Sequence, residues 1–128
     1  MNVTNLINIC PLSVIRNEAK NLTVGLFNAQ SVCQPEKRVS ICDFICDADV
    51  DILFLTETWL NSSGDEARCI DLAPCGYDVR SFPRLTRGGG LAIVARKTIF
   101  QSLKFTSSFT FDHSSFELVM VTLSLRNR

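Results

Sequence analysis

Four apolar runs set the hydrophobic pattern of the chain: residues 22–27, 52–55, 91–95 and 116–125. The first three have the length of buried β-strands. The fourth is the longest, and its apolar side chains fall on both faces of an extended segment, so both faces need a covering layer. The pattern predicts a sheet whose strands are buried against other elements.

A helical repeat separates the first two of these runs. Pro35 suits the first position of a helix, and Glu36 suits its positive end. A strand, a helix and a second strand in this order predict a right-handed crossover between parallel strands. The apolar residues of the helix recur at intervals of three and four along one face: Val39, Cys42, Ile45 and Cys46.

The rest of the chain shows shorter elements. Residues 61–72 open with serines and acidic residues and predict a short helix with a serine cap. Residues 77–82 read as an edge strand, and residues 83–90 form a turn rich in glycine and arginine. Residues 91–95 and 99–105 read as two strands joined by a three-residue turn, which predicts an antiparallel hairpin.

The two ends of the chain affect the domain organisation. Residues 1–20 are interrupted by asparagine, proline and arginine, so we expect a poorly ordered leader, without a signal peptide or a membrane span. Residues 21–128 form the predicted domain. The sequence of 128 residues ends shortly after the run 116–125, and one side of that run needs a further covering layer. We therefore expect residues 21–128 to be a truncated domain.

Charge and cysteine content narrow the class of protein. Thirteen basic and thirteen acidic residues cancel, so contact with nucleic acid needs a local basic patch. Six cysteines without a secretory signal predict reduced thiols in an intracellular protein, in the nucleus or the cytoplasm, as small buried side chains in preference to metal ligands. The candidates for a basic patch, equally well explained as a solvated surface, stand near the glycine turn and the hairpin turn: Arg84, Arg87, Arg96 and Lys97.

Asn28 directly follows the first predicted strand, and Glu57 stands two residues after the second. The carboxyl ends of parallel strands meet at one edge of a sheet, where open α/β sheets bind ligands, so we expect these two side chains to lie together. A carboxylate beside an amide can hold a hard cation. Two plainer interpretations stay open: Asn28 can cap the turn that follows it, and Glu57 can form an ion pair with Arg87.

Four segments, in this order and spacing, resemble the endonuclease/exonuclease/phosphatase family, and within it the apurinic-like endonuclease domain of non-LTR (LINE-type) retrotransposon polyproteins. The resemblance implies the N-terminal half of a four-layer α/β sandwich, a mixed sheet with helices on its outer face. The segments are residues 27–31 (Phe-Asn-Ala-Gln-Ser), 51–60 (Asp-Ile-Leu-Phe-Leu-Thr-Glu-Thr-Trp-Leu), 74–77 (Pro-Cys-Gly-Tyr) and 87–93 (Arg-Gly-Gly-Gly-Leu-Ala-Ile).

The resemblance also implies an activity and its residues. Members of this kind nick one strand of target DNA, so that a 3′-hydroxyl can prime reverse transcription. Glu57 matches the carboxylate that binds the essential Mg²⁺ (or Mn²⁺), and Asn28 matches the amide beside it that helps orient the phosphate. The implied partners are the backbone of the target DNA and a downstream reverse transcriptase domain, with no membrane.

Other residues weaken or qualify this interpretation. The family's later Asp-x-Asn and Ser-Asp-His motifs do not occur in this sequence, so we expect little or no nuclease activity from the chain alone. His113 is the only histidine, and we favour a solvated loop residue over a general base. Trp59 is favoured as a packing residue over a base-stacking one.

Two other functions stay open at this point. The chain can be a degenerate, non-catalytic fragment that survives as a binding or structural module. It can also be a phosphoesterase of the same fold that acts on a substrate other than DNA. The segments around Glu57 and the three glycines favour the retroelement nuclease.

Overall fold

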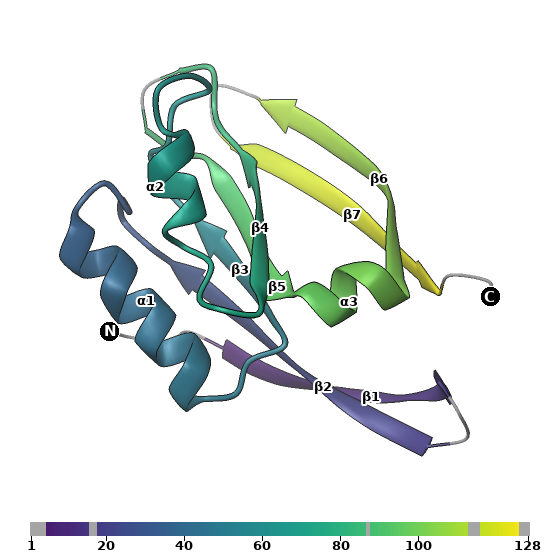
Figure 1. The fold of residues 1–128 in the computed structure, drawn as a ribbon. Helices are drawn as coiled ribbons and strands as arrows, with labels where there is room; N and C mark the ends of the chain where they lie inside the picture. The colour runs from purple at the N-terminus through teal and green to yellow at the C-terminus, as the bar shows by residue number, and fades with distance from the viewer. Residues whose placement is uncertain (1–4, 16–17, 87, 113–115, 126–128) are drawn as a thin grey trace.

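The structure, a computed structural model, describes residues 5–15, 18–86, 88–112 and 116–125. Within these ranges a five-stranded sheet has the order β1-β2-β3-β5-β4, and β6 and β7 form a second sheet (Figure 1). This is the mixed α/β sheet with flanking helices that the sequence predicted. The elements are β1 (Asn5–Ile15), β2 (Glu18–Asn28), α1 (Pro35–Asp47), β3 (Ile52–Thr56), α2 (Glu66–Ile70), β4 (Tyr77–Phe82), β5 (Leu91–Arg96), α3 (Lys97–Ser102), β6 (Leu103–Asp112) and β7 (Glu117–Leu125).

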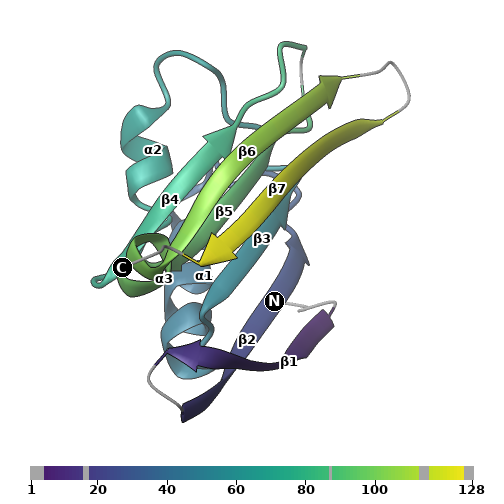
Figure 2. The same ribbon diagram turned by 90° about the vertical axis from the view of Figure 1, so that its right-hand side faces the viewer.

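The elements stack in three layers. Helices α1 and α2 lie on one face of the five-stranded sheet, and the β6-β7 ribbon crosses the other face (Figures 1 and 2). On the helical side, Ile41 and Ile45 of α1 pack in one apolar cluster with Leu53 and Leu55 of β3. The alternate residues of β3 and β5 enter a second cluster on the opposite face, because successive side chains of a strand point to opposite sides. Strand β3 is therefore covered on both faces.

The predicted crossover is confirmed. Strands β2 and β3 are parallel, with α1 between them in sequence, and their register places Asn28 opposite Thr56. Strand β5 runs antiparallel to β3, with Leu91 opposite Thr56. Strand β4 pairs with β5 alone and forms the predicted edge strand. The carboxyl ends of β2 and β3 and the amino end of β5 therefore share one edge of the sheet.

Helix α1 begins at the predicted residue, but its buried face differs from the prediction. Val39 is 59% exposed and Cys46 is also exposed, so they do not share the buried face. The buried residues are Arg38, Ile41 and Ile45, which repeat at the same helical intervals. The apolar spacing alone misled the prediction because a charged side chain occupies one position of the true inner face.

Two local predictions are wrong. Helix α2 has Asp65 at its N-cap, not a serine, and no side-chain cap. The predicted hairpin is absent, since β5 continues into α3 and β6 pairs with β7 in the second sheet. Burial explains the helical turn: Phe100 of α3 packs in the second cluster with Ile52 and Ile93. A hairpin partner for β5 would also displace β3 or β4, which already flank it on both sides.

Residues 1–20, the expected leader, contain β1 and the start of β2 in the structure. The two strands pair antiparallel, from Asn5 opposite Leu26 to Ile15 opposite Glu18. The register shifts between Ile9 and Leu12, next to a proline that lacks a backbone donor. Within the described ranges, no helix combines the length and the hydrophobicity that a bilayer-spanning segment requires.

A polar clamp joins four strands where β3 begins. The Asp51 carboxylate accepts hydrogen bonds from the Thr23 N–H and from Arg96 Nε, both over 2.8 Å. The Arg96 guanidinium also pairs with Asp49 and lies over the Tyr77 ring, 5.1 Å from its centroid. Since Thr23, Tyr77 and Arg96 belong to β2, β4 and β5, the clamp ties these strands to the start of β3.

Replacing Arg96 by Met should lower the free energy of unfolding by about 1–3 kcal/mol, because the half-buried Asp51 carboxylate loses a charged donor. Replacing the adjacent, exposed Lys97 by Met should change it by less than about 0.5 kcal/mol. Urea denaturation followed by circular dichroism measures both variants. Equal losses in the two would contradict the clamp.

Candidate functional site

Asn28 and Glu57 meet at the edge of the sheet where β2 and β3 end, as the sequence predicted. Asn28 Nδ2 donates a hydrogen bond to Glu57 Oε1 over 3.1 Å. The Gln30 N–H donates to Asn28 Oδ1, also over 3.1 Å. Because a backbone donor must face the amide oxygen, the amide nitrogen is left facing the carboxylate. The contact confirms the predicted proximity, whereas the catalytic role of the two residues stays a prediction.

Backbone hydrogen bonds continue past the strand ends and hold the loops under this contact side by side. The Ser31 N–H donates to the Glu57 carbonyl over 2.7 Å. On the other side, the Thr58 N–H donates to the Gly90 carbonyl over 3.0 Å. The loop after β2, the loop after β3 and the turn before β5 therefore run side by side, and their hydrogen bonds position the backbone at Asn28 and Glu57.

The backbone at this edge is strained. Glu57 and Trp59 have φ angles of 54° and 59°, and Ser31 has 80°. These are left-handed values that residues with a Cβ rarely adopt. The hydrogen bonds between the three loops fix the peptide groups on either side, so the strain persists. Strain of this kind concentrates at functional sites, which makes this edge of the sheet the candidate site.

Two glycines allow the turn before β5 to approach these loops. A Cβ at Gly90, where φ is +85°, would lie 2.7 Å from Thr58 Oγ1. A Cβ at Gly89, where φ is +67°, would lie 2.8 Å from the Arg84 side chain and 2.9 Å from the Glu117 carboxylate. At Gly90 the close atom belongs to the fully buried Thr58, so glycine is required there by conformation and by space. At Gly89 the close atoms belong to flexible side chains that can move, so the left-handed conformation is the main reason for glycine.

A cavity of about 450 Å³ opens beside Glu57 between the two sheets. Glu117, at the start of β7, contributes a second carboxylate, and its Oε2 accepts a hydrogen bond from the Gly90 N–H over 3.0 Å. The cavity thus contains charged and aromatic side chains from both sheets. Besides the glycine turn, its lining includes Thr56, Glu57, Trp59, Arg84, Phe116 and Glu117.

A comparison with protein families bears on this site. The model of the endonuclease/exonuclease/phosphatase family matches residues 25–121 of the chain. The chain belongs to the endonuclease/exonuclease/phosphatase family. The matched region covers more than half of the chain and includes both strand ends, the glycine turn and Glu117. No curated protein matches the chain. Membership in this family indicates a hydrolase of the phosphodiesterase or nuclease type.

For a family of such hydrolases, the ability of the site to hold a cation matters. Among the described residues, no hydrogen bond engages Glu57 Oε2, which could accept a cation. Asn28 is a poorer candidate metal ligand than the sequence predicted, because its donor nitrogen faces Glu57 and its oxygen already accepts the Gln30 N–H. No three His, Cys, Asp or Glu side chains of the described residues are grouped to hold a metal ion. Glu57 Oε2 is therefore the oxygen at this contact that a cation could use.

Of the basic residues predicted to contact DNA, two lie away from this edge. Arg84 lines the cavity. Arg96 and Lys97 lie at the opposite end of β5, where Arg96 is held in the clamp with Asp51, so the prediction of one shared basic cluster is wrong for them. Arg87 lies outside the described residues, as does its proposed ion pair with Glu57, and so does His113.

The cysteines whose side chains the structure describes show no arrangement typical of a metal site. Cys33, Cys42, Cys46, Cys69 and Cys75 are free thiols. Cys46 and Cys75 are exposed, and the other three are half-buried, so the prediction of small buried side chains holds only in part. Burial raises the pKa values of the Cys42 and Cys69 thiols, which favours the neutral form of both.

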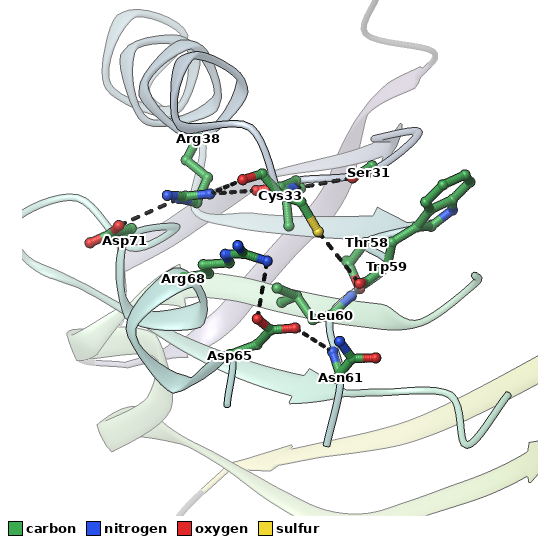
Figure 3. A network of polar contacts seen from close by, with 11 residues as sticks. Ser31, Cys33, Arg38, Thr58, Trp59, Leu60, Asn61, Asp65, Arg68 and Asp71 are labelled. Atoms are coloured by element: carbon green, nitrogen blue, oxygen red, sulfur yellow. Dashed lines mark hydrogen bonds and ion pairs between the residues drawn. The ribbon is translucent and has the colours of Figure 1, made fainter. Parts of the chain in front are cut away.

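A buried arginine supports the loop that follows Asn28 (Figure 3). Arg38 Nη1 donates hydrogen bonds to the carbonyls of Val32 and Cys33, each over 2.8 Å. Its Nε lies 3.4 Å from the Asp71 carboxylate, within range of an ion pair but without a hydrogen bond. The Cys33 thiol in turn contacts the Trp59 carbonyl at 3.6 Å. Arg38 therefore positions the two loops that carry the candidate site.

The sequence interpretation missed Arg38 and Glu117. Arg38 stands three residues before Ile41 and seven before Ile45, which places it on the apolar face of α1. Glu117 is the only charged residue of the run 116–125. A charge within an apolar pattern was the available signal for both, since such a charge needs a specific partner.

Replacing Gly90 by Ala should lower the free energy of unfolding by about 1–3 kcal/mol more than replacing Gly64 by Ala. The two glycines have nearly the same φ, +85° and +86°, but a Cβ at Gly64 meets nothing within 4 Å. The difference isolates the close approach to Thr58 from the cost of the left-handed conformation. Chemical denaturation of both variants measures it, and equal losses would contradict the contact.

Replacing Arg38 by Met should lower the free energy of unfolding by about 2–3 kcal/mol, because the Val32 and Cys33 carbonyls lose their donor. Arg68 offers a matched control: it pairs with Asp65 at 3.2 Å, but its side chain is 44% exposed. Replacing Arg68 by Met should cost less than about 1 kcal/mol. Thermal and urea unfolding measure both, and the reverse order would show that Arg38 is dispensable.

Proposed function

We propose that the chain is a Mg²⁺-dependent (or Mn²⁺-dependent) nuclease domain that acts on phosphodiester bonds of DNA. The contact of Asn28 with Glu57 at the carboxyl edge of β2 and β3 carries this proposal. The edge also has strained backbone and opens into a cavity, in a chain of the endonuclease/exonuclease/phosphatase family. A hydrolase of that family needs a bound cation and an oriented phosphate, which these residues suit.

Each residue has a distinct task in this proposal. Glu57 would hold the cation with the carboxylate oxygen that Asn28 does not engage, while Asn28 holds Oε1 and so fixes the direction of the carboxylate. A cation held there would withdraw charge from a phosphoryl oxygen of the substrate. Arg84, on the wall of the same cavity, offers a positive charge to a neighbouring phosphate. The sequence lacks the family's water-activating motifs, so we propose that the chain binds cation and phosphate but turns over slowly or not at all.

The finer proposal is a retrotransposon origin. The segments 27–31, 51–60 and 87–93, which carry the resemblance to LINE-type endonucleases, lie side by side at the candidate site, as the hydrogen bonds between their described residues show. On this proposal the protein acts inside the cell, in the nucleus or the cytoplasm, on the backbone of target DNA. A reverse transcriptase domain encoded downstream would use the 3′-hydroxyl that the nick creates.

Replacing Glu57 by Gln should weaken Mn²⁺ binding at least about tenfold, because the carboxylate that binds the cation becomes neutral. Replacing Asn28 by Ala should weaken it by a smaller factor, since Asn28 acts through Glu57. Electron paramagnetic resonance of free Mn²⁺ measures both. Any Mg²⁺-dependent nicking of supercoiled plasmid by the chain should be lost in Glu57→Gln.

Glu66→Gln is the matched control for this experiment, because Glu66 is an exposed glutamate on α2. It should bind Mn²⁺ as the wild type does. Equal binding by wild type and Glu57→Gln would overturn the proposal. Preferred hydrolysis of a phosphoester other than DNA would instead support a phosphoesterase of the same fold.

A further inference from the structure

The tryptophan beside the candidate site is not a core residue. Trp59 stands two positions after Glu57, and 46% of it is exposed. Its ring extends away from the polar network that holds its own backbone (Figure 3). The sequence favoured packing for this side chain, but a packing tryptophan would be covered. An exposed large aromatic ring at the edge of a cavity indicates a contact surface.

The backbone of Trp59 holds the ring in this position against its conformational preference. Its φ of 59° is unfavourable for a bulky residue. The Trp59 N–H donates to the Gly89 carbonyl over 2.7 Å, and its carbonyl accepts the Cys33 thiol at 3.6 Å. Both backbone groups are therefore fixed from opposite sides. A strained residue that its surroundings hold so firmly points to a function of its side chain.

Trp59 shares its cavity with a second exposed aromatic ring. Phe116, directly before β7, is 53% exposed and lines the same cavity of about 450 Å³, within the range of small-molecule pockets. A Cβ at Gly88 would lie 3.9 Å from the indole, an ordinary van der Waals distance, so the glycine turn runs beside the ring. Glu57 and Arg84 line the cavity beside these rings. Aromatic faces, a cation-binding carboxylate and a guanidinium thus occupy one pocket.

We propose that Trp59 and Phe116 form a stacking site for an unpaired nucleobase next to the phosphodiester that Glu57 handles. This inference rests on the proposed function and names its substrate as a strand with at least one unstacked base. Bases stack on aromatic side chains without regard to sequence, while the phosphate is held by charge. The site therefore selects single-stranded or distorted DNA and not a particular sequence.

The chain offers a direct probe, because Trp59 is its only tryptophan. Intrinsic fluorescence is measured while the 128-residue chain is titrated, in Mg²⁺, with an octamer of thymidylate. A second titration uses an octamer of the same backbone charge in which every base is absent. Stacking predicts saturable quenching by the thymidylate octamer and at least about fivefold weaker binding of the baseless octamer. Equal quenching by both octamers, or none by either, would overturn the proposal.

Variants test the same proposal with fluorescein-labelled octamers and anisotropy. Trp59→Leu should lose about fivefold or more in affinity for the thymidylate octamer and nothing for the baseless one. Trp59→Phe should retain most of the affinity, which guards against a loss caused by misfolding. Leu85→Ala, at a residue that is 89% exposed and outside the cavity lining, should bind both octamers as the wild type does. Equal weakening of both octamers by Trp59→Leu would identify Trp59 as a packing residue.

The two proposals fail in different ways. Loss of Mn²⁺ binding in Glu57→Gln together with base-independent octamer binding would reject the stacking site and keep the nuclease site. Quenching that depends on the bases, with Mn²⁺ binding unchanged in Glu57→Gln, would reject the cation site and keep base stacking. Each pair of results therefore rejects one proposal and keeps the other.

Discussion

The candidate site depends on backbone hydrogen bonding that does not stop where the strands stop. Beyond Asn28 and Thr56 the chains leave extended geometry, yet the Ser31 N–H still reaches the Glu57 carbonyl and the Thr58 N–H still reaches Gly90. Three loops that would otherwise move independently are thereby held at strand spacing. Since a side chain is positioned only as well as its backbone, this lateral bonding is what allows one amide and one carboxylate to stay in contact at an exposed edge.

The two ends of β3 differ in what they contribute: the start stabilises the sheet, and the far end leads into the candidate site. At its start, Arg96, Asp51 and Thr23 form satisfied contacts between strands. At its far end, Glu57 and Trp59 have left-handed conformations that cost free energy. Strained backbone at one end of β3 requires that the rest of the strand be well held, because strain persists only where the surroundings fix it. The burial of β3 on both faces and the clamp at its start hold the strand in place.

Sequence reasoning succeeded where one strong periodicity and one topological rule applied. Two apolar runs separated by a helix have few arrangements, and the parallel crossover brings Asn28 and Glu57 to one edge whatever the details of packing. The prediction of a strand over residues 99–105 was wrong because a short apolar segment is compatible with helix or strand, and only the burial of Phe100 decides between them. A strand over residues 91–95 already separates Gly90 from Arg96, but the sequence does not indicate which of them lies beside Glu57; that follows once β5 is known to run antiparallel to β3.

The exposure of Trp59 could not be deduced from its sequence neighbours either, since alternation along β3 ends at Thr56. The left-handed conformation of Glu57 changes which side chains face inward, so that Thr58 is the buried one. This arrangement needs Gly89 and Gly90, which allow the turn before β5 to approach Thr58 and leave room for the Glu117 carboxylate.

Glu117 belongs to the second sheet, and its hydrogen bond to Gly90 joins that sheet to the turn on which the strained loops depend. The packing of β7 over the five-stranded sheet and the geometry at Glu57 are therefore coupled through Gly90. A change that loosens the two-stranded ribbon should reach the site through Gly90 before it reaches the core of β3, because β3 is held independently by β2 and β5.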